Sequence, residues 1–415
     1  MRMSRRDAVR ILGASALLAL SLTLPIPAAA DEMGTAVRVM ATDAANGDLT
    51  VIDPESGEIV GRFTTPTGGY TYVYPSENGR YLLTNHYAGE HVTIVDAGLG
   101  LEPHGDHADL VTNPPFVLAT VATGSVPAHY AAHDGIIAIH NDGDGTITIL
   151  DESELARKVD PFTFAVAQPD HTSIAIINDT VLVGYYDLGR VDAYSLDGEL
   201  IAEGVGDCPG THGEARFGDS VAFACGDGVL LVTPDGDHFT TEKVAYPGSE
   251  TDSDLDATPV ADGEAPRIGS IAAHHDNDVL VGDFGAALAL MTPHDAGLDI
   301  AVLPLSGEAL AFTYDHLGEH VTVLTDDGQV HGVDPNAGEV LWSTPAVTPY
   351  TEIELGDGFD FWPKLAASDT ALYVADPKAG EIVEIDLESG EVLHRFAIGG
   401  QPARVTLTLA SGVQH

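Results

Sequence analysis

The chain has 415 residues, of which 17 are Lys or Arg and 64 are Asp or Glu, so its formal net charge is −47. Contacts to nucleic-acid phosphates or to anionic membrane surfaces need clusters of Lys and Arg, and this balance excludes both kinds of partner. The hydrophobic content of 44% is nevertheless that of a folded protein, not of a disordered acidic tail.

The N-terminus has the layout of an export signal. Four arginines lie within residues 1–10, an apolar run covers residues 11–24, and alanines occupy residues 28–30. The run is too short to span a bilayer of about 30 Å, and the small residues are typical of a cleavage site. We expect residues 1–30 to be a signal peptide that directs export to the periplasm by the Sec or twin-arginine route. No later run is long enough for a membrane span, so we expect no membrane insertion and a single domain over residues 31–415.

After the signal, one pattern recurs: an alternating strand-like run, an Asp or Pro, a Gly-containing turn and a second run. Residues 49–60 and 381–393 are clear copies, and weaker copies lie between them at an average spacing of about 48 residues. No later segment shows a helical apolar period. The pattern predicts an all-β fold, namely a β-propeller of eight four-stranded blades, or of seven if one weak copy is a decorated connection.

The strand order within a copy predicts how the ring closes. The first copy begins at Val37 with a second-strand pattern and lacks an innermost strand, whereas residues 403–409 form a strand with no partners after it. Pairing the N-terminal and C-terminal strands in one composite blade leaves no open sheet edge. An insertion over residues 97–114 separates the third and fourth strands of the second blade.

The two cysteines, Cys208 and Cys225, flank an expected hairpin. In an oxidising periplasm we expect them to form a disulfide, worth about 3 kcal/mol from the entropy of the loop that it closes. A redox-active pair needs tighter spacing, such as Cys-x-x-Cys, which the sequence lacks.

Histidines carry the candidate chemistry. In an antiparallel blade the innermost strand begins on the face where the second strand ends, so residues at these two positions meet at one mouth of the channel. His129, His171 and His212 occupy the first position in three consecutive copies, and His86 and His140 occupy the second. Neutral imidazoles bind Zn²⁺ in tetrahedral sets at about 2.0–2.1 Å, so five of them at one mouth predict a metal site. Four carboxylates lie nearby in phase and are candidates for completing it: Asp142, Asp187, Glu214 and Asp283.

A second histidine cluster lies in the insertion, where His104 and His107 flank Asp106. We expect it to be a mobile loading or hand-off site beside the fixed one. The ligand types alone do not separate zinc from nickel or copper. Motifs for other chemistry are absent: the sequence has no Gly-x-Ser-x-Gly elbow, no phosphate-binding loop and no His-Glu-x-x-His.

Several stretches together resemble the AztD-type periplasmic zinc metallochaperones: residues 104–107, 127–146, 208–215 and 224–228. The resemblance implies a propeller that passes Zn²⁺ to the solute-binding protein of a zinc ABC importer. It places the zinc-binding histidines at His129, His171 and His212, and a disulfide between Cys208 and Cys225. The chain departs from the family in having no histidine in residues 31–37, which shifts attention to His104 and His107 as the loading site.

Three functions follow from these observations. The favoured one is a monomeric, non-enzymatic zinc chaperone, whose affinity should fall below about pH 6 as its imidazoles protonate. The runner-up is a metal-dependent, lactonase-like propeller hydrolase with Glu214 as general base. The third is a metal-free interaction scaffold.

Overall fold

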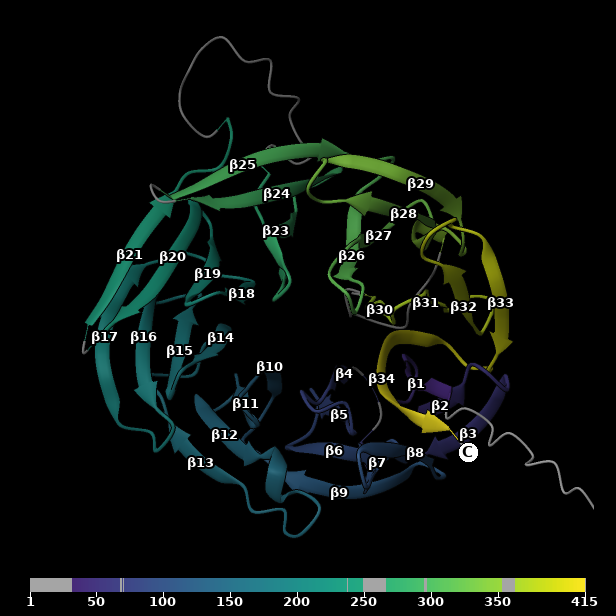
Figure 1. Cartoon of the computed structure of the whole chain (residues 1–415). Helices are drawn as coiled ribbons and strands as arrows, with labels where there is room; N and C mark the ends of the chain where they lie inside the picture. Colours follow the sequence, from purple (N-terminus) through teal and green to yellow (C-terminus); the bar gives the residue numbers. More distant parts are fainter. Residues whose placement is uncertain are drawn as a thin grey trace, which may run out of the picture.

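In the computed structural model, eight β-sheets surround a central channel (Figure 1). The structure describes residues 32–67, 69, 71–236, 238–248, 266–294, 297–352 and 363–414. Seven sheets have four strands, and the eighth, which contains both ends of the described chain, has six. The eight-bladed propeller expected from the repeats is therefore confirmed, and the seven-bladed alternative is excluded. The expected signal peptide, residues 1–30, lies outside the described residues.

Each blade consists of four strands, named in order from the channel outward. Blade one is β34 (Pro402–Gln414), β1 (Glu32–Asp43), β2 (Leu49–Asp53) and β3 (Glu58–Phe63). Blade two is β4 (Thr71–Pro75), β5 (Tyr81–His86), β6 (His91–Asp96) and β9 (Phe116–Ala122). Blade three is β10 (Pro127–His133), β11 (Ile136–Asn141), β12 (Thr146–Asp151) and β13 (Phe162–Ala165). Blade four is β14 (Thr172–Ile177), β15 (Thr180–Tyr185), β16 (Arg190–Ser195) and β17 (Leu200–Asp207).

The second half of the ring repeats the same order. Blade five is β18 (Glu214–Phe217), β19 (Ser220–Cys225), β20 (Gly228–Asp235) and β21 (His238–Val244). Blade six is β22 (Ile271–His274), β23 (Asn277–Asp283), β24 (Ala287–His294) and β25 (Gly297–Pro304). Blade seven is β26 (Ala309–Tyr314), β27 (Val321–Thr325), β28 (Gln329–Asp334) and β29 (Glu339–Pro345). Blade eight is β30 (Ala366–Ala367), β31 (Ala371–Asp376), β32 (Glu381–Asp386) and β33 (Val392–Ala397).

The helical content of the described residues is limited to two short 3₁₀ turns, Glu152–Glu154 and Tyr350–Glu352. No helix in the described part of the chain is long and apolar enough to cross a membrane.

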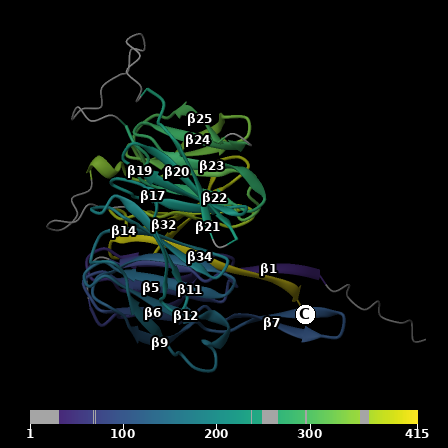
Figure 2. The same cartoon turned by 90° about the vertical axis from the view of Figure 1, so that its left-hand side faces the viewer.

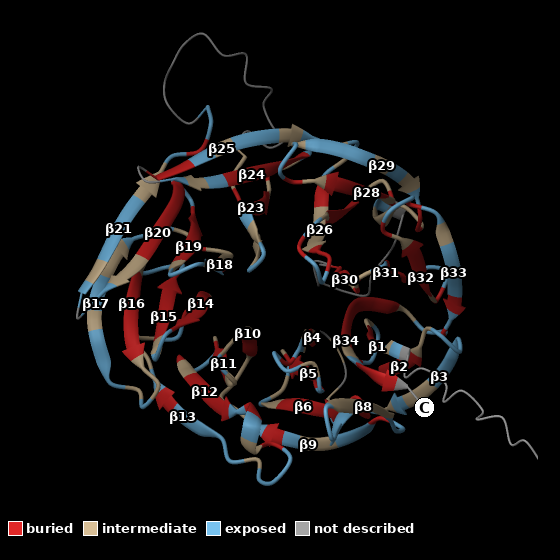
Figure 3. Ribbon diagram, in the orientation of Figure 1, coloured by how far each residue is buried: buried red, intermediate tan, exposed pale blue. Residues whose placement is uncertain are grey.

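The hydrophobic core lies between the blades. Each pair of neighbouring blades shares one cluster of buried side chains; for example, Leu83 and Ile94 of blade two pack with Ile137 and Ile139 of blade three. The second and third strands are the most buried, and the outermost strands face solvent (Figure 3). Burial of apolar surface at about 25 cal/mol per Å² therefore holds each blade to its neighbours instead of filling one central core.

The ring closes as expected. Strand β34 is the innermost strand of blade one, and it pairs antiparallel with β1 from Glu32↔Gln414 to Asp43↔Pro402. The first and last described strands therefore share one sheet, and the composite blade predicted from the sequence is confirmed.

The strand directions define two faces of the disc. We call the face where the innermost strands begin the upper face and the other the lower face. The insertion of blade two forms a hairpin of β7 (Leu99–His104) and β8 (His107–Thr112) that follows β6, a strand that ends on the lower face. Strand β8 pairs with the end of β34 at Asp109↔Val413, and β7 projects beyond the disc on the side where β1 begins (Figure 2). The expected position of this insertion beside the channel-mouth histidines is thus wrong, because those histidines lie on the upper face.

The disulfide between Cys208 and Cys225 is confirmed, with an S–S distance of 2.06 Å and both residues fully buried. Cys208 follows the outermost strand of blade four, and Cys225 ends the second strand of blade five. The bond therefore links two neighbouring blades and closes a loop that contains His212.

Replacing both cysteines (Cys208→Ala, Cys225→Ala) should lower the free energy of unfolding by about 3 kcal/mol, because the unfolded chain regains the entropy of the open loop. Guanidinium unfolding of the oxidised protein and of the variant measures the difference. The wild-type protein unfolded with a reductant present should match the variant, and an unchanged midpoint in the variant would contradict the prediction.

Candidate metal centre

Histidines from neighbouring blades meet at one carboxylate on the upper face. Asp142, which follows β11, accepts a hydrogen bond from His171 Nδ1 at 2.8 Å and one from His140 Nδ1 at 2.9 Å. His129 Nε2 lies 3.5 Å from Asp142 Oδ2 and 3.3 Å from His171 Nδ1. The ring of His212 lies beyond His171, with 5.0 Å between the two centroids. Three of the five expected channel-mouth histidines, His129, His140 and His171, therefore gather around Asp142, and His212 lies next to His171.

Local backbone geometry directs these side chains. The pairing of β10 with β11 shifts between Pro127 and His129, and such an irregularity re-aims the side chain that follows it. Val126, just before β10, has a φ of 57°, which is strained for a β-branched residue. Its carbonyl accepts a hydrogen bond from the Asp142 N–H at 2.9 Å. The strained residue therefore fixes the turn that carries the central carboxylate.

The three histidines do not share the same register, although the sequence suggested that they would. His129 is the third residue of β10, His171 directly precedes β14, and His212 stands two residues before β18. The rings nonetheless converge, because the shift in β10 moves His129 back toward the upper face. The proline or glycine before each innermost strand indicated the region of the blade in which each histidine lies, but not its exact position relative to the strand.

Three atoms form a triangle of the size that zinc needs. His129 Nε2, His171 Nδ1 and Asp142 Oδ2 are separated by 3.3, 2.8 and 3.5 Å. Ligands at about 2.0–2.1 Å in a tetrahedral set stand about 3.3 Å from one another. These residues therefore fit Zn²⁺ with little movement, and a fourth position remains for another ligand.

His212 and His140 are held in defined orientations around this triangle. The Nδ1–H of His212 donates to the Gly269 carbonyl at 2.6 Å, which leaves Nε2 of the neutral ring with a free electron pair. His140 is fully buried and bonded to Asp142, so it orients the carboxylate instead of facing the channel. The ligand atoms that lie within 4.8 Å of one another are those of His129, Asp142 and His171, so His212 would have to move to take the fourth position.

His86 does not join the cluster, and its expected place at the channel mouth is wrong. Its Nε2 lies 2.9 Å from Thr93 Oγ1, and its ring stacks on His91 with 4.3 Å between centroids. His86 and His91 are cross-strand partners in β5 and β6, so the ring is buried inside blade two.

The other carboxylates have supporting positions. Asp283 accepts hydrogen bonds from the N–H groups of Gly269 and Ser270 and so holds the loop that receives His212. Burial raises the pKa of Asp283 to about 6 and that of Glu214 to about 8. At neutral pH Glu214 is therefore mostly a neutral acid and not the ionised base that a hydrolase would require. Asp187 donates its backbone N–H to Asp170 and is in none of the His–carboxylate groups found among the described residues.

The charges of the cluster suit a cation. Burial alone would raise the pKa of Asp142, but the neighbouring His129 and the hydrogen bonds from His129, His140 and His171 outweigh it, and the pKa stays well below its usual range. Burial lowers the pKa of His129, and it lowers that of His212 to about 4. The site thus combines an ionised carboxylate with neutral imidazoles, which are the protonation states that metal binding requires.

The hairpin on the lower face holds a separate group. His104 Nδ1 lies 3.0 Å from Asp109 Oδ2, and His107 Nε2 lies 3.1 Å from Asp109 Oδ1. The sequence singles out Asp106, which is fully exposed and lies 3.2 Å from His107 Nδ1. Asp109 was missed, although the period of two along a strand places residues 107 and 109 on one side of β8.

Comparison with known proteins agrees with this architecture. A family model described as outer membrane protein assembly factor BamB matches residues 306–413, which is about a quarter of the chain. The zinc chaperone AztD of Citrobacter koseri is 26% identical over 408 residues, covering 96% of this chain and 92% of the relative.

Two solved structures of Citrobacter koseri AztD have the same fold. One matches with a TM-score of 0.78 and 23% identity, covering 92% of this chain and all of that chain. The apo form matches with a TM-score of 0.76 and 21% identity, covering 91% of this chain and 99% of that one. The resemblance to the AztD-type zinc metallochaperones that the sequence indicated is therefore confirmed along nearly the whole chain.

Proposed function

We propose that this protein is a periplasmic zinc metallochaperone that binds Zn²⁺ at the upper mouth of its channel. The observation that carries the proposal is the triangle of His129, His171 and Asp142, whose dimensions suit tetrahedral zinc. The similarity to a protein named as a zinc chaperone supports Zn²⁺ as the ion that this protein carries. It also favours a carrier over an enzyme.

The site has the properties that a carrier needs. Its ligand-bearing side chains remain between 10% and 37% exposed, so an acceptor can reach the metal. Only three protein atoms form the triangle, and the ring of His212 lies next to that of His171, so a movement of His212 could fill or vacate the fourth position. A partner can therefore replace the ligands one at a time, which keeps the cation bound throughout the exchange.

The partner that we propose is the zinc solute-binding protein of an ABC importer. The support is the likeness to AztD-type chaperones together with the expected export signal. Zinc-loaded protein mixed with the apo form of that binding protein should lose its zinc to it. Separation of the two proteins followed by metal analysis of each measures the transfer.

The hairpin group is the second proposed zinc site. His104, His107 and Asp109 offer two imidazoles and one carboxylate on an element that projects from the disc. His104 is 68% exposed, so metal bound there exchanges with solvent more readily than metal in the upper cluster. This group suits loading of the protein from solution.

The double variant His129→Ala, His171→Ala should lose tight zinc binding, because two of the three atoms of the triangle are gone. His140→Ala should bind about 10–100-fold more weakly, because Asp142 loses the hydrogen bond that orients it. Competition with a chromogenic chelator measures both effects. His394→Ala, on the exposed outer strand β33, is the control and should bind like the wild type. Wild-type affinity in the double variant would overturn the proposed site.

The pH at which zinc affinity falls should be lower than unperturbed imidazoles suggest. Because burial lowers the pKa of His212 to about 4 and also lowers that of His129, protons compete for these two rings only at a pH below that at which an unperturbed imidazole titrates. We expect the steepest fall below about pH 5, by up to about tenfold per pH unit for each protonating ligand. Chelator competition from pH 7.5 to 4 tests this, and His212→Ala should flatten the acidic limb. A zinc affinity that has already reached its low-pH minimum at pH 6 would contradict this prediction.

A further inference from the structure

A third group of metal-binding side chains lies on the lower face, apart from both sets above. The turn between β22 and β23 carries His274, His275 and Asp276. One potential ligand atom from each residue lies within 4.8 Å of the other two. The ring centroids of His274 and His275 are 4.4 Å apart, and His275 Nε2 is 3.0 Å from Asp276 Oδ2.

We propose that this turn is an additional binding site for a borderline divalent cation such as Zn²⁺, weaker and faster in exchange than the upper cluster. The inference rests on the proposed function in one respect, namely that Zn²⁺ is the ion that the protein binds. The two imidazoles and one carboxylate are the ligand types that zinc takes in proteins, and they lie on three consecutive residues.

The hydrogen bonds of the turn show which nitrogen of His274 is unprotonated. The backbone N–H of Asp276 donates to His274 Nδ1 at 3.2 Å, so this nitrogen is unprotonated. A cation would take the place of that N–H, and the freed N–H lies in an exposed turn where water can bond to it.

Exposure accounts for the weaker binding. The side chains of His275 and Asp276 are 75% and 65% exposed, whereas His129 and Asp142 of the upper cluster are 19% and 10% exposed. Tetrahedral zinc needs ligand atoms about 3.3 Å apart, so the more widely spaced atoms of the turn must move together when the ion binds. Water would fill the remaining positions, and a ligand brought by another molecule could displace it.

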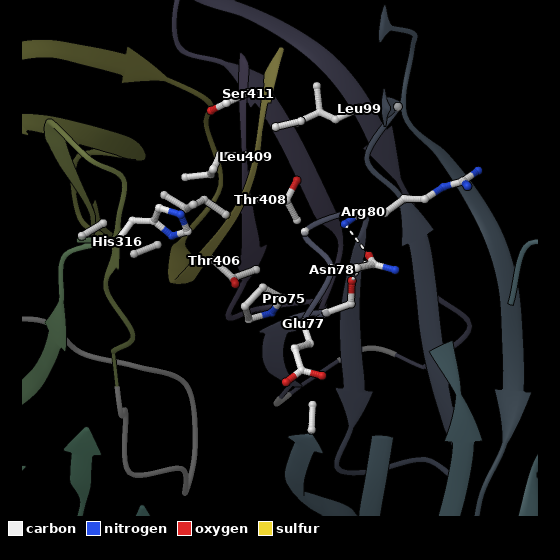
Figure 4. A pocket seen from close by; sticks show the side chains of 18 of the residues that line it. Pro75, Glu77, Asn78, Arg80, Leu99, His316, Thr406, Thr408, Leu409 and Ser411 are labelled. Atoms are coloured by element: carbon white, nitrogen blue, oxygen red, sulfur yellow. Dashed lines mark hydrogen bonds between the residues drawn. The ribbon is translucent and has the colours of Figure 1, made fainter. Parts of the chain in front are cut away.

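The position of the turn gives the site a context. His274 and His316 line a cavity of about 1480 Å³ on the lower face, together with residues 99–102 at the base of the metal-binding hairpin (Figure 4). The charged residues in the lining are the acidic Glu77, Asp96, Glu102 and Asp315 and the basic Arg80 and Lys364, so acidic groups outnumber basic ones there. The turn, through His274, and the base of the hairpin, through residues 99–102, therefore border the same cavity.

The test uses the mature protein and zinc chloride alone. Equilibrium dialysis should show that His275→Ala, Asp276→Ala binds one weakly held zinc fewer per chain than the wild type. The matched control is Asp235→Ala, His238→Ala, which removes an exposed His–Asp pair from the β20–β21 turn and should leave the number unchanged. Zinc should also slow the modification of His275 by diethyl pyrocarbonate, followed by mass spectrometry.

The outcomes separate this inference from the proposed function. An unchanged zinc number in the turn variant, or no protection of His275, overturns the inference. If the tight zinc also survives the substitution of His129 and His171, the proposed function fails as well. If only that double variant loses tight zinc, the proposed function stands without the third site.

Discussion

The pairing of β1 with β34 is the interaction on which the rest of the structure depends. Each blade is stabilised by the apolar side chains that it shares with its neighbours, so an open ring would expose two such surfaces and two sheet edges. The antiparallel register between the first and last described strands removes both. Because the innermost strands then stand at fixed positions around the channel, side chains from separate blades can meet at distances of about 3 Å.

The candidate metal centre is an example of this dependence. His129 and His171 belong to different blades, yet both reach Asp142, and their separations vary by only a few tenths of an ångström from those of a tetrahedral set. His140 and His171 both donate a hydrogen bond to Asp142 and so hold the carboxylate in place. The bond from His171 must be given up when a metal enters, whereas that from His140 can remain, and this cost limits the affinity and favours a site that can also release its cargo.

Much of the fold could be predicted from the sequence, because a propeller consists of repeats of alternating strands with glycine-containing turns. The composite first blade and a ring of eight blades, with seven as the alternative, followed from these local patterns. The disulfide followed from the presence of two cysteines in an expected oxidising compartment. The region of the upper cluster followed as well, because His129, His171 and His212 precede or begin innermost strands. His86 did not fit, since one position along a strand decides whether a side chain faces the channel or the blade interior. The place of Asp109 beside His107 becomes recognisable only once residues 107–112 are known to form a strand, which the weak local pattern of the insertion does not reveal.

The closure of the ring also determines where anything attached to the chain will stand. Glu32 and Gln414 are paired neighbours in blade one, and the hairpin with His104 and His107 joins the same sheet through β8. A tag or tether joined at either position therefore emerges next to the lower cavity and leaves the upper mouth open. When the protein is immobilised through such a tether, its His129–Asp142–His171 cluster points away from the support. The choice of attachment point therefore decides which face of the disc is accessible to zinc or a partner in a surface-bound assay.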